Sequence, residues 1–234
     1  MSARLNFNAT EPKGFIFDFD GTLADSMGVW KYIDDEFMRR HNIEAVDEYK
    51  KLIVALGFEA GSKWVAKYFD LGICAEEIQQ EWIDLAKASY EKYVVLNPGA
   101  IDYVKAVRAA GLPTSIATSL NIDLLKSALR ANNAIDLFDG LVSCDECSSE
   151  GKLEPTVYLE AAKKMSALTN TEITLNDCVV FEDISLAAST AKKAGATVVG
   201  KLNKIVEDVE GFSDNNASLK EICHYTITSF IELI

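Results

Sequence analysis

The amino-acid sequence predicts an α/β protein built on a doubly wound, mostly parallel sheet, with a helical segment inserted near its start. Short runs of β-branched and apolar residues recur along the 234-residue chain, as expected for strands that are buried on both faces of a parallel sheet. Between the later runs, apolar residues recur at spacings of three and four, which is typical of amphipathic helices. Strands that alternate with helices form open, doubly wound sheets of the Rossmann-like kind.

Six segments are predicted to be strands, four of them from clear apolar runs and two from weaker ones. They lie at residues 14–18, 114–118, 140–143, 178–182, 197–200 and 225–227. Apolar residues on one helical face mark the segments between the later strands as helices. The last of these stripes is made of alanines and stops at Gly195, a typical residue at a helix end.

The spacing of the first two clear strands is unusual. The first ends at Asp18 and the next begins at Thr114, and the sequence between them has the apolar periodicity of helices almost throughout. We therefore expect an α/β core formed by residues 1–26 and 97–234, with a helical cap at 27–96. An insert after the carboxyl end of a strand lies above the place where such sheets bind ligands, which predicts a lid.

Charge limits the partners of this chain. Lys and Arg total 23 and Asp and Glu total 36, which gives a net charge of −13 without a dense basic run. Such a chain repels nucleic acid and anionic membranes. No stretch approaches the roughly 18 apolar residues of a membrane span, and the polar start lacks the apolar core of a secretory signal. We expect a cytoplasmic monomer.

The five cysteines are odd in number and irregularly spaced, which argues against a disulfide framework. Cys144 and Cys147 form a single C-x-x-C pair, and no second pair or nearby histidine completes a zinc site. We expect these thiols to be reduced. His41 and His224 are the only histidines, so a structural role is expected for both.

Acidic residues end two of the predicted strands. Asp18 and Asp20 follow the first strand, and Glu182 and Asp183 end the strand that begins at residue 178. An Asx-type turn would also explain the first pair, but neighbouring carboxylates repel one another unless a cation neutralises them. Because the carboxyl ends of parallel strands share one edge, the four acids can converge there. Oxygen ligands without histidine or cysteine suit Mg²⁺.

The same edge is predicted to gather groups that bind phosphate. Thr118 and Ser119 follow the strand at 114–118, and Lys152 lies just before a predicted helix. Taken singly, Thr118 or Lys152 is more typical of a capping or surface residue. Together, hydroxyls, backbone N–H groups, a lysine and a divalent cation form a phosphate cradle.

Five segments, in the expected order, resemble motifs of the haloacid dehalogenase superfamily. They are DFDGTLADS at 18–26, ATS at 117–119, GKLEP at 151–155, FED at 181–183 and AKKAG at 191–195. The match spans nearly the whole chain, and the helical insert resembles the small cap of the β-phosphoglucomutase-like branch. Leu153 stands where this superfamily usually has proline, and Ile184 where it often has serine.

The resemblance implies a magnesium-dependent reaction in two steps. Asp18 would attack phosphorus and form an aspartyl-phosphate, and Asp20 would act first as the acid and then as the base. Mg²⁺ would be held by Asp18, the backbone carbonyl of Asp20 and Asp183, with Glu182 in the outer shell or as an alternate ligand. Haloacid dehalogenases proper lack the second aspartate and need no metal, so Asp20 argues for phosphate chemistry.

The resemblance further implies that Thr118, the Ser119 N–H and Lys152 hold the phosphoryl oxygens as charge spreads over them. We therefore expect a phosphatase that hydrolyses a small phosphorylated metabolite, with a sugar phosphate as the favoured substrate. A phosphomutase of the β-phosphoglucomutase type is the enzymatic alternative. A non-catalytic phosphate-binding protein is the alternative of another class, and loss of a motif aspartate would be its sign.

Two cap positions bear on the choice between hydrolysis and phosphoryl shuttling. The histidine by which β-phosphoglucomutases help to protect their aspartyl-phosphate falls at Trp30 in this sequence, and an indole cannot accept a hydrogen bond as an imidazole does. The arginine that grips the distal phosphate in those enzymes is also missing, although Lys63 lies nearby as a possible replacement. Trp30 and Lys63 are therefore the candidate cap contacts to substrate.

Overall fold

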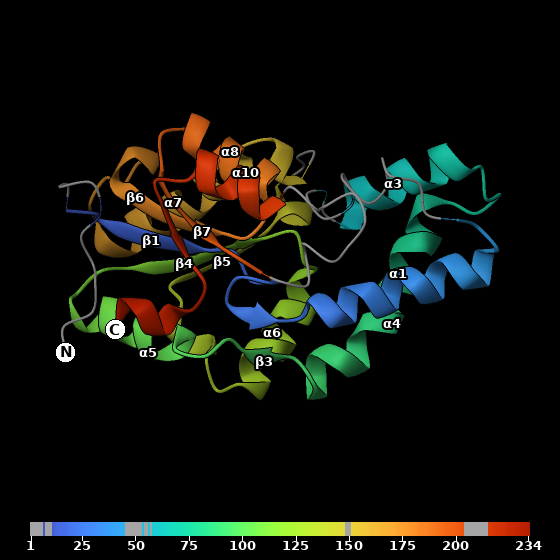
Figure 1. The fold of residues 1–234 in the computed structure, drawn as a ribbon, viewed down its shortest axis with the longest axis horizontal. Coiled ribbons are helices and arrows are strands. Elements are labelled where there is room, and N and C mark those ends of the chain that lie inside the picture. Colours follow the sequence, from blue (N-terminus) through green and yellow to red (C-terminus); the bar gives the residue numbers. More distant parts are fainter. Residues whose placement is uncertain are drawn as a thin grey trace.

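The computed structural model describes residues 7, 11–44, 53, 56, 58–147, 151–203 and 215–234. Its centre is a six-stranded parallel sheet in the order β5-β4-β1-β6-β7-β8 (Figure 1). The strands are β1 (Gly14–Phe17), β4 (Thr114–Thr118), β5 (Gly140–Ser143), β6 (Cys178–Glu182), β7 (Thr197–Lys201) and β8 (Tyr225–Ile227). The predicted α/β class, with its doubly wound parallel sheet, is confirmed.

The register of the central strands brings their carboxyl ends to one edge. Phe17, the last residue of β1, lies opposite Ile116 of β4 and Phe181 of β6. The residue that follows each strand therefore emerges at the same edge of the sheet. This alignment places Asp18 between the end of β4 at Thr118 and the end of β6.

Helices cover both faces of this sheet (Figure 1). One face carries α7 (Thr156–Thr169), α8 (Ser185–Lys193) and α10 (Asn215–Ile222), and the other carries α5 (Ala100–Ala109), α6 (Ile122–Ala131) and the short helix η5 (Phe230–Leu233). Because successive side chains of a strand point to opposite faces of the sheet, β1 contributes to the apolar core on both faces. Phe15 and Phe17 pack edge-on against Tyr103 of α5, whereas Ile16 joins the apolar cluster that includes Tyr158 of α7.

Three helices of the insert lie beyond the carboxyl ends of the strands (Figure 1). They are α1 (Met27–His41), α3 (Phe58–Phe69) and α4 (Ala75–Lys92). Ile33 and Phe37 of α1, Val65 of α3 and Trp82 of α4 are buried, so the apolar faces of these helices pack on one another. The apolar stripes predicted from the periodicity thus supply the interior of this part of the molecule, except at Tyr68, which is exposed.

The chain enters and leaves the insert through a two-stranded antiparallel ribbon of β2 (Ala24–Asp25) and β3 (Val95–Leu96). Ala24 pairs with Leu96, and Asp25 pairs with Val95. The Asn97 N–H donates to the Leu23 carbonyl at 2.7 Å, which extends this pairing toward the loop that follows β1. The two crossing segments are therefore tied together beside that loop.

The remaining described elements are the short 3₁₀ helices η1 (Ile135–Leu137), η2 (Cys144–Glu146), η3 (Gly151–Leu153) and η4 (Leu175–Asp177). All five cysteines are free thiols. His41 pairs with a glutamate, and His224 Nδ1 accepts the backbone N–H of Val198 at 3.0 Å, so both histidines have structural partners. Among the described residues, no helix is both long and apolar enough to cross a bilayer.

Candidate active site

The first acid of the site is fixed by the end of β1. Asp18 directly follows this buried strand, and its N–H donates to the Phe181 carbonyl of β6 at 2.9 Å. The chain then turns at Gly21, whose φ of +77° lies in the left-handed region that favours glycine. A Cβ at this position would clash with the Asp183 carboxylate, so only glycine lets the loop approach the end of β6 this closely.

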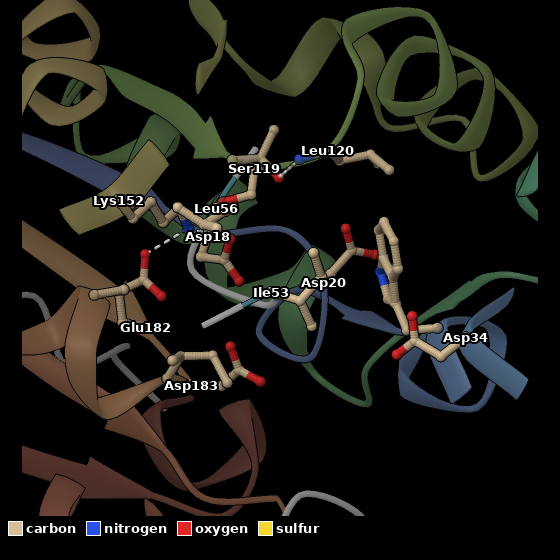
Figure 2. Close-up of a pocket in the computed structure, with 14 residues that line it drawn as sticks. Asp18, Asp20, Asp34, Ile53, Leu56, Ser119, Leu120, Lys152, Glu182 and Asp183 are labelled. Carbon is tan, nitrogen blue, oxygen red and sulfur yellow. Dashed lines mark hydrogen bonds and ion pairs between the residues drawn. The ribbon is translucent and has the colours of Figure 1, made fainter. Parts of the chain in front are cut away.

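Three buried carboxyl groups converge at this edge, as Figure 2 shows. Asp18, Glu182 and Asp183 each offer an oxygen, and these oxygens lie within 4.8 Å of one another. Lys152, from η3, is itself buried and donates from Nζ to Asp18 Oδ1 and, at 2.6 Å, to Glu182 Oε1. Burial alone would lower the pKa of Lys152, but the charges of Asp18 and Glu182 raise it, so the ammonium persists.

The unsatisfied oxygens of this cluster fit a divalent cation. Glu182 Oε2 and Asp183 Oδ1 are buried and accept no hydrogen bond from the described residues. Burial raises the pKa of Glu182 to about 7 and that of Asp183 well above its usual range, and the neighbouring carboxylates add to both shifts. Three carboxyl groups face one ammonium, and buried charge is costly unless it is paired. A small cation that prefers oxygen ligands would pair with the free oxygens and would balance the excess negative charge.

The side-chain amides of Asn203 and Asn215 donate to Asp183, but only one of its two carboxylate oxygens receives such a bond. Asn203 Nδ2 donates to Asp183 Oδ2 at 3.0 Å and to the Gly21 carbonyl at 2.7 Å. Asn215 Nδ2 donates to the Asp183 carbonyl at 2.8 Å, and Lys201 Nζ donates to Asn203 Oδ1 at 2.9 Å. Sequence reasoning missed these residues, although Lys201 ends β7 and Asn203 follows it, so both carried the same positional signal as the four acids.

Asp20 is held by Ser26, at the end of the first core segment, and by two side chains of the insert. Its Oδ1 accepts hydrogen bonds from Ser26 Oγ at 2.6 Å and from the Tyr90 hydroxyl of α4, and the Trp30 side chain also donates to this carboxylate. Burial raises the pKa of Asp20 to about 6, while these donors oppose the rise. Tyr90 was missed because it continues the buried stripe of Ile78, Trp82 and Ala86 at spacings of four. Such a stripe predicts a buried ring but does not show what its hydroxyl contacts.

Glu182 has a second partner that the sequence did not reveal. The Tyr158 hydroxyl of α7 donates to Glu182 Oε1 at 2.7 Å, the same oxygen that accepts from Lys152. Tyr158 lies on the apolar stripe of its helix and is buried. One oxygen of Glu182 is thereby saturated, and the other is left without a donor.

The residues expected to bind phosphate line one wall of the same pocket. Thr118 is buried at the end of β4, and its Oγ1 accepts the Leu120 N–H at 3.0 Å, which leaves its own proton available to a ligand. Ser119 follows it, and both residues border the pocket together with Lys152 and Asp18. The structure thus brings the predicted hydroxyl, lysine and acid residues together.

The pocket lies between core and insert. The core contributes Asp18, Asp20, Thr118, Ser119, Leu120, Lys152, Glu182, Asp183, Ile184 and Ala187, and the insert contributes Trp30, Asp34, Ile53 and Leu56 (Figure 2). Trp30 is therefore at the pocket, as expected. Lys63 is not, because its side chain is 61% exposed and pairs with Glu59 on the same helix at 2.5 Å. The expectation that Lys63 reaches the substrate is not supported by its position.

Known proteins resemble this chain over most of its length. The model of the haloacid dehalogenase-like hydrolases matches residues 12–195. The protein CbbY of Rhodobacter capsulatus is 28% identical over 203 residues, which are 81% of this chain and 85% of that protein. Hexitol phosphatase A of Escherichia coli is 28% identical over 193 residues, covering 80% of this chain and 82% of the enzyme.

Solved structures share the fold. CbbY from Rhodobacter sphaeroides, in complex with xylulose 1,5-bisphosphate, superposes with a TM-score of 0.74 at 20% identity and covers 95% of this chain and 96% of its own. A β-phosphoglucomutase from Clostridium difficile gives a TM-score of 0.72 at 15% identity, covering 95% and 93%. At these identities the likeness supports the fold alone.

The fold, the buried acid and lysine cluster and the relatives together define a hydrolase of phosphoric monoesters. The chain belongs to the haloacid dehalogenase-like hydrolase family, and its architecture is that of the β-phosphoglucomutase-like branch. The resemblance read from the sequence motifs is confirmed. Members of this family generally use a divalent metal, and the three buried carboxyl groups offer ligands for one.

Proposed function

We propose that this protein is a Mg²⁺-dependent phosphatase that hydrolyses a small phosphorylated metabolite, a sugar phosphate or a derivative of one. The observation that carries the proposal is the convergence of Asp18 with Lys152 and two unsatisfied buried oxygens at the base of one pocket. The related phosphatases support the reaction class. Residues 27–96 act in this proposal as a cap over residues 1–26 and 97–234.

In the first half of the reaction, a carboxylate oxygen of Asp18 attacks phosphorus. An O–P bond to Asp18 forms while the P–O bond to the leaving group breaks, and Asp20 gives its proton to the departing oxygen. Lys152 supports this step from its position against Asp18, because its ammonium neutralises negative charge on the phosphoryl oxygens. Thr118 Oγ1 and the Ser119 N–H hold the remaining oxygens.

In the second half, water attacks the aspartyl-phosphate. Asp20, now ionised, takes the proton of that water while the O–P bond to Asp18 breaks and inorganic phosphate forms. The donors on Asp20 Oδ1 fix the orientation of this carboxylate through both halves. Closure of the cap over the pocket would exclude bulk water from the first half.

The residues present fit Mg²⁺. Asp18, Asp183 and the backbone carbonyl of Asp20 would hold the ion, with Glu182 beside it and bound to Lys152. When bound, the cation supplies electrostatic stabilisation of the phosphoryl oxygens and neutralises the acids around it. The amide of Asn203 orients Asp183 so that the unpaired Oδ1 remains available as a ligand.

Phosphate release from p-nitrophenyl phosphate, with and without Mg²⁺, tests the proposal. We expect Asp18→Asn to lower kcat at least about a thousandfold while circular dichroism stays unchanged, because an amide is neither a nucleophile nor an anionic ligand. Asp25→Asn, an exposed acid of the same segment, is the matched control and should keep its rate. Near-normal turnover by Asp18→Asn would overturn the assignment of the nucleophile.

The mutase alternative is separated by following two products. The protein is supplied with β-glucose 1-phosphate and glucose 1,6-bisphosphate, and glucose 6-phosphate and free phosphate are measured together. The phosphatase predicts free phosphate as the main product, because Trp30 and not a histidine contacts Asp20 at this site. Efficient formation of glucose 6-phosphate with little free phosphate would contradict the proposal.

A further inference from the structure

β7 ends in a buried lysine close to the acid cluster. Lys201 is the last residue of this strand and is only 5% exposed. Its Nζ donates to Asn203 Oδ1 at 2.9 Å and to the Leu202 carbonyl at 3.3 Å, and both acceptors are uncharged. Burial lowers the pKa of Lys201, and nearby acids, Asp183 first among them, oppose this change. A buried ammonium is costly, so its position against an uncharged amide calls for a physical reason.

The amide of Asn203 has a single orientation that satisfies its neighbours. The two protons of its Nδ2 go to the Gly21 carbonyl at 2.7 Å and to Asp183 Oδ2 at 3.0 Å, while its Oδ1 accepts from Lys201. A flipped amide would set its oxygen against two acceptors and its NH₂ group against an ammonium that can only donate. Lys201 and the two acceptors therefore select the same orientation from opposite ends of the amide.

The backbone of Asn203 is fixed as well. Asn216 of α10 accepts the Asn203 N–H at its Oδ1 at 3.2 Å and donates from Nδ2 to the Asn203 carbonyl at 3.1 Å. The preceding residue, Leu202, donates its N–H to the Ile227 carbonyl of β8 at 2.8 Å. The amide is therefore attached to the core through β8 and α10, and it can serve as a fixed support for the groups that it contacts.

This amide joins two of the groups that would hold Mg²⁺. Asp183 accepts it at Oδ2, which leaves Oδ1 without a partner among the described residues. Gly21 directly follows Asp20, the backbone carbonyl of which is a proposed ligand. The Gly21 carbonyl and the Asp183 carboxylate are both acceptors, and the donor shared by them holds the loop after β1 against the end of β6.

We propose that Lys201 is a positioning residue of the metal site, which acts on Mg²⁺ through the amide of Asn203. The inference rests on the proposed Mg²⁺-dependent phosphatase and deepens it. In this proposal β7 joins β1 and β6 among the strands that shape the ion site. Lys201 does not contact the ion, and its ammonium serves to hold Asn203 Oδ1 so that Nδ2 stays on Asp183 and Gly21.

Charge and positioning predict opposite effects of Lys201 on Mg²⁺. A positive charge near a cation repels it, so loss of Lys201 would tighten Mg²⁺ binding if charge alone acted. Positioning predicts weaker binding, because loss of the ammonium leaves Asn203 Oδ1 without its donor and loosens the amide. A purely structural lysine would lower the Tm of the metal-free protein and leave its affinity for Mg²⁺ unchanged.

Calorimetric titration of the metal-free protein with Mg²⁺ measures this affinity without reference to activity, and the Mg²⁺-induced rise in Tm checks it. We expect Lys201→Met to raise the Kd for Mg²⁺ about three- to tenfold, and Asn203→Leu about tenfold or more. Lys201→Gln, which keeps an N–H donor without the charge, should raise it less than Lys201→Met. Lys220→Met, which removes an exposed lysine of α10, is the control and should leave the Kd unchanged.

The double variant tests whether Lys201 acts through Asn203. Because Asn203→Leu already lacks the amide, the addition of Lys201→Met should raise the Kd no further. Additive losses would show that the two residues act separately and would overturn the proposal. Circular dichroism in EDTA shows whether each variant is folded. If Lys201→Met does not fold, Lys201→Gln decides, since charge alone predicts a Kd below that of the unmodified protein and positioning does not.

Three further outcomes would overturn the inference. Tighter Mg²⁺ binding by Lys201→Met would show that the lysine acts by repulsion. An unchanged Kd in Asn203→Leu would show that the amide does not shape the site. Equal losses in Lys201→Met and Lys201→Gln would show that the hydrogen bond to Asn203 is not the cause. Absence of Mg²⁺ binding by the unmodified protein would instead overturn the proposed Mg²⁺-dependent function, and the inference with it.

Discussion

The two sides of the active-site pocket differ in chemistry. The core side is charged and densely hydrogen-bonded, with Lys152 joined to Asp18 and Glu182 at the ends of β1 and β6. Where the structure describes it, the insert side is mostly apolar, with Trp30, Ile53 and Leu56 beside Asp34. We therefore propose that the core side carries out the reaction and that the insert side selects the substrate. The variants below test whether this division holds.

The largest effect is expected on the core side, at the metal. Asp183→Ala should raise the Mg²⁺ concentration for half-maximal activity about a hundredfold, because it removes an anionic oxygen from a cation that dehydrates reluctantly. Metal titrations of activity, together with Mg²⁺-induced shifts of Tm, measure this requirement. Glu182→Ala should raise it less, since one oxygen of Glu182 is occupied by Lys152 and Tyr158. A larger effect of Glu182→Ala would reverse the order of the ligands.

An intermediate effect is expected where the insert contacts the core acid. Tyr90→Phe removes a donor from Asp20 Oδ1 while keeping the buried ring. We expect kcat for an alkyl phosphate, whose leaving oxygen needs a proton, to fall about three- to tenfold. The rate with p-nitrophenyl phosphate should fall less, because nitrophenolate leaves without protonation.

The control for this variant is Tyr68→Phe, since Tyr68 is 47% exposed on α3 and is not among the described residues that line the pocket. It should leave both rates unchanged. If Tyr90→Phe slowed the two substrates equally, Tyr90 would contribute to the packing of α4 and not to the position of Asp20. Tyr90 would then take no part in the chemistry. The reaction would depend on the core side of the pocket more completely than proposed.

The smallest effect is expected at the opposite edge of the sheet, far from both sides of the pocket. Lys13 pairs with Asp177 at 2.8 Å, and this hydrogen bond, with the backbone N–H of Thr174, lowers the pKa of Asp177 to about 2. Because the folded-state pKa lies below the unfolded value, the stabilisation is complete above about pH 4 and is lost as the pH falls toward 2. We expect Asp177→Asn to cost about 1 kcal/mol at pH 7, after allowing for solvent screening.

Urea unfolding of both proteins at several pH values measures this effect. The difference between Asp177→Asn and the unmodified protein should shrink as the pH falls from 4 to about 2, the lowered pKa. Phosphatase activity at pH 7 should be unchanged. A constant difference in stability across this range would show that the Lys13–Asp177 pair is not its source.

The sequence predicted the sheet and its polar edge because both follow from local patterns. A buried run such as residues 14–17 has few alternatives to a strand, and parallel pairing then brings Asp18 and Glu182 to one edge without further information. The alignment of the motifs also placed Trp30 at the pocket. The sheet and its polar edge needed only the chain order and the direction of the strands, whereas the position of Trp30 came from the family resemblance.

The side-chain hydrogen bonds of the site could not be read in this way. Tyr90, Tyr158 and Trp82 lie on helical stripes that mark them as core, and periodicity does not show where a hydroxyl or an indole N–H points. Lys63 shows the opposite limit, because its spacing suggested a substrate contact, whereas the structure pairs it with Glu59 one helical turn away. Contacts between elements distant in the chain, such as Asn203 with Gly21, depend on the assembled fold.

The ribbon of β2 and β3 has a consequence for how this chain can change. Because Ala24 pairs with Leu96, the two ends of the inserted segment lie opposite each other on one ladder, about 5 Å apart. A two-residue hairpin turn spans such a gap. The connection of the segment to the core therefore interrupts no strand of the central sheet. The segment is still part of the folded core, because α4 packs against α6 and Tyr90 of α4 donates to Asp20. A chain shortened here to a turn would lose that donor to the carboxylate.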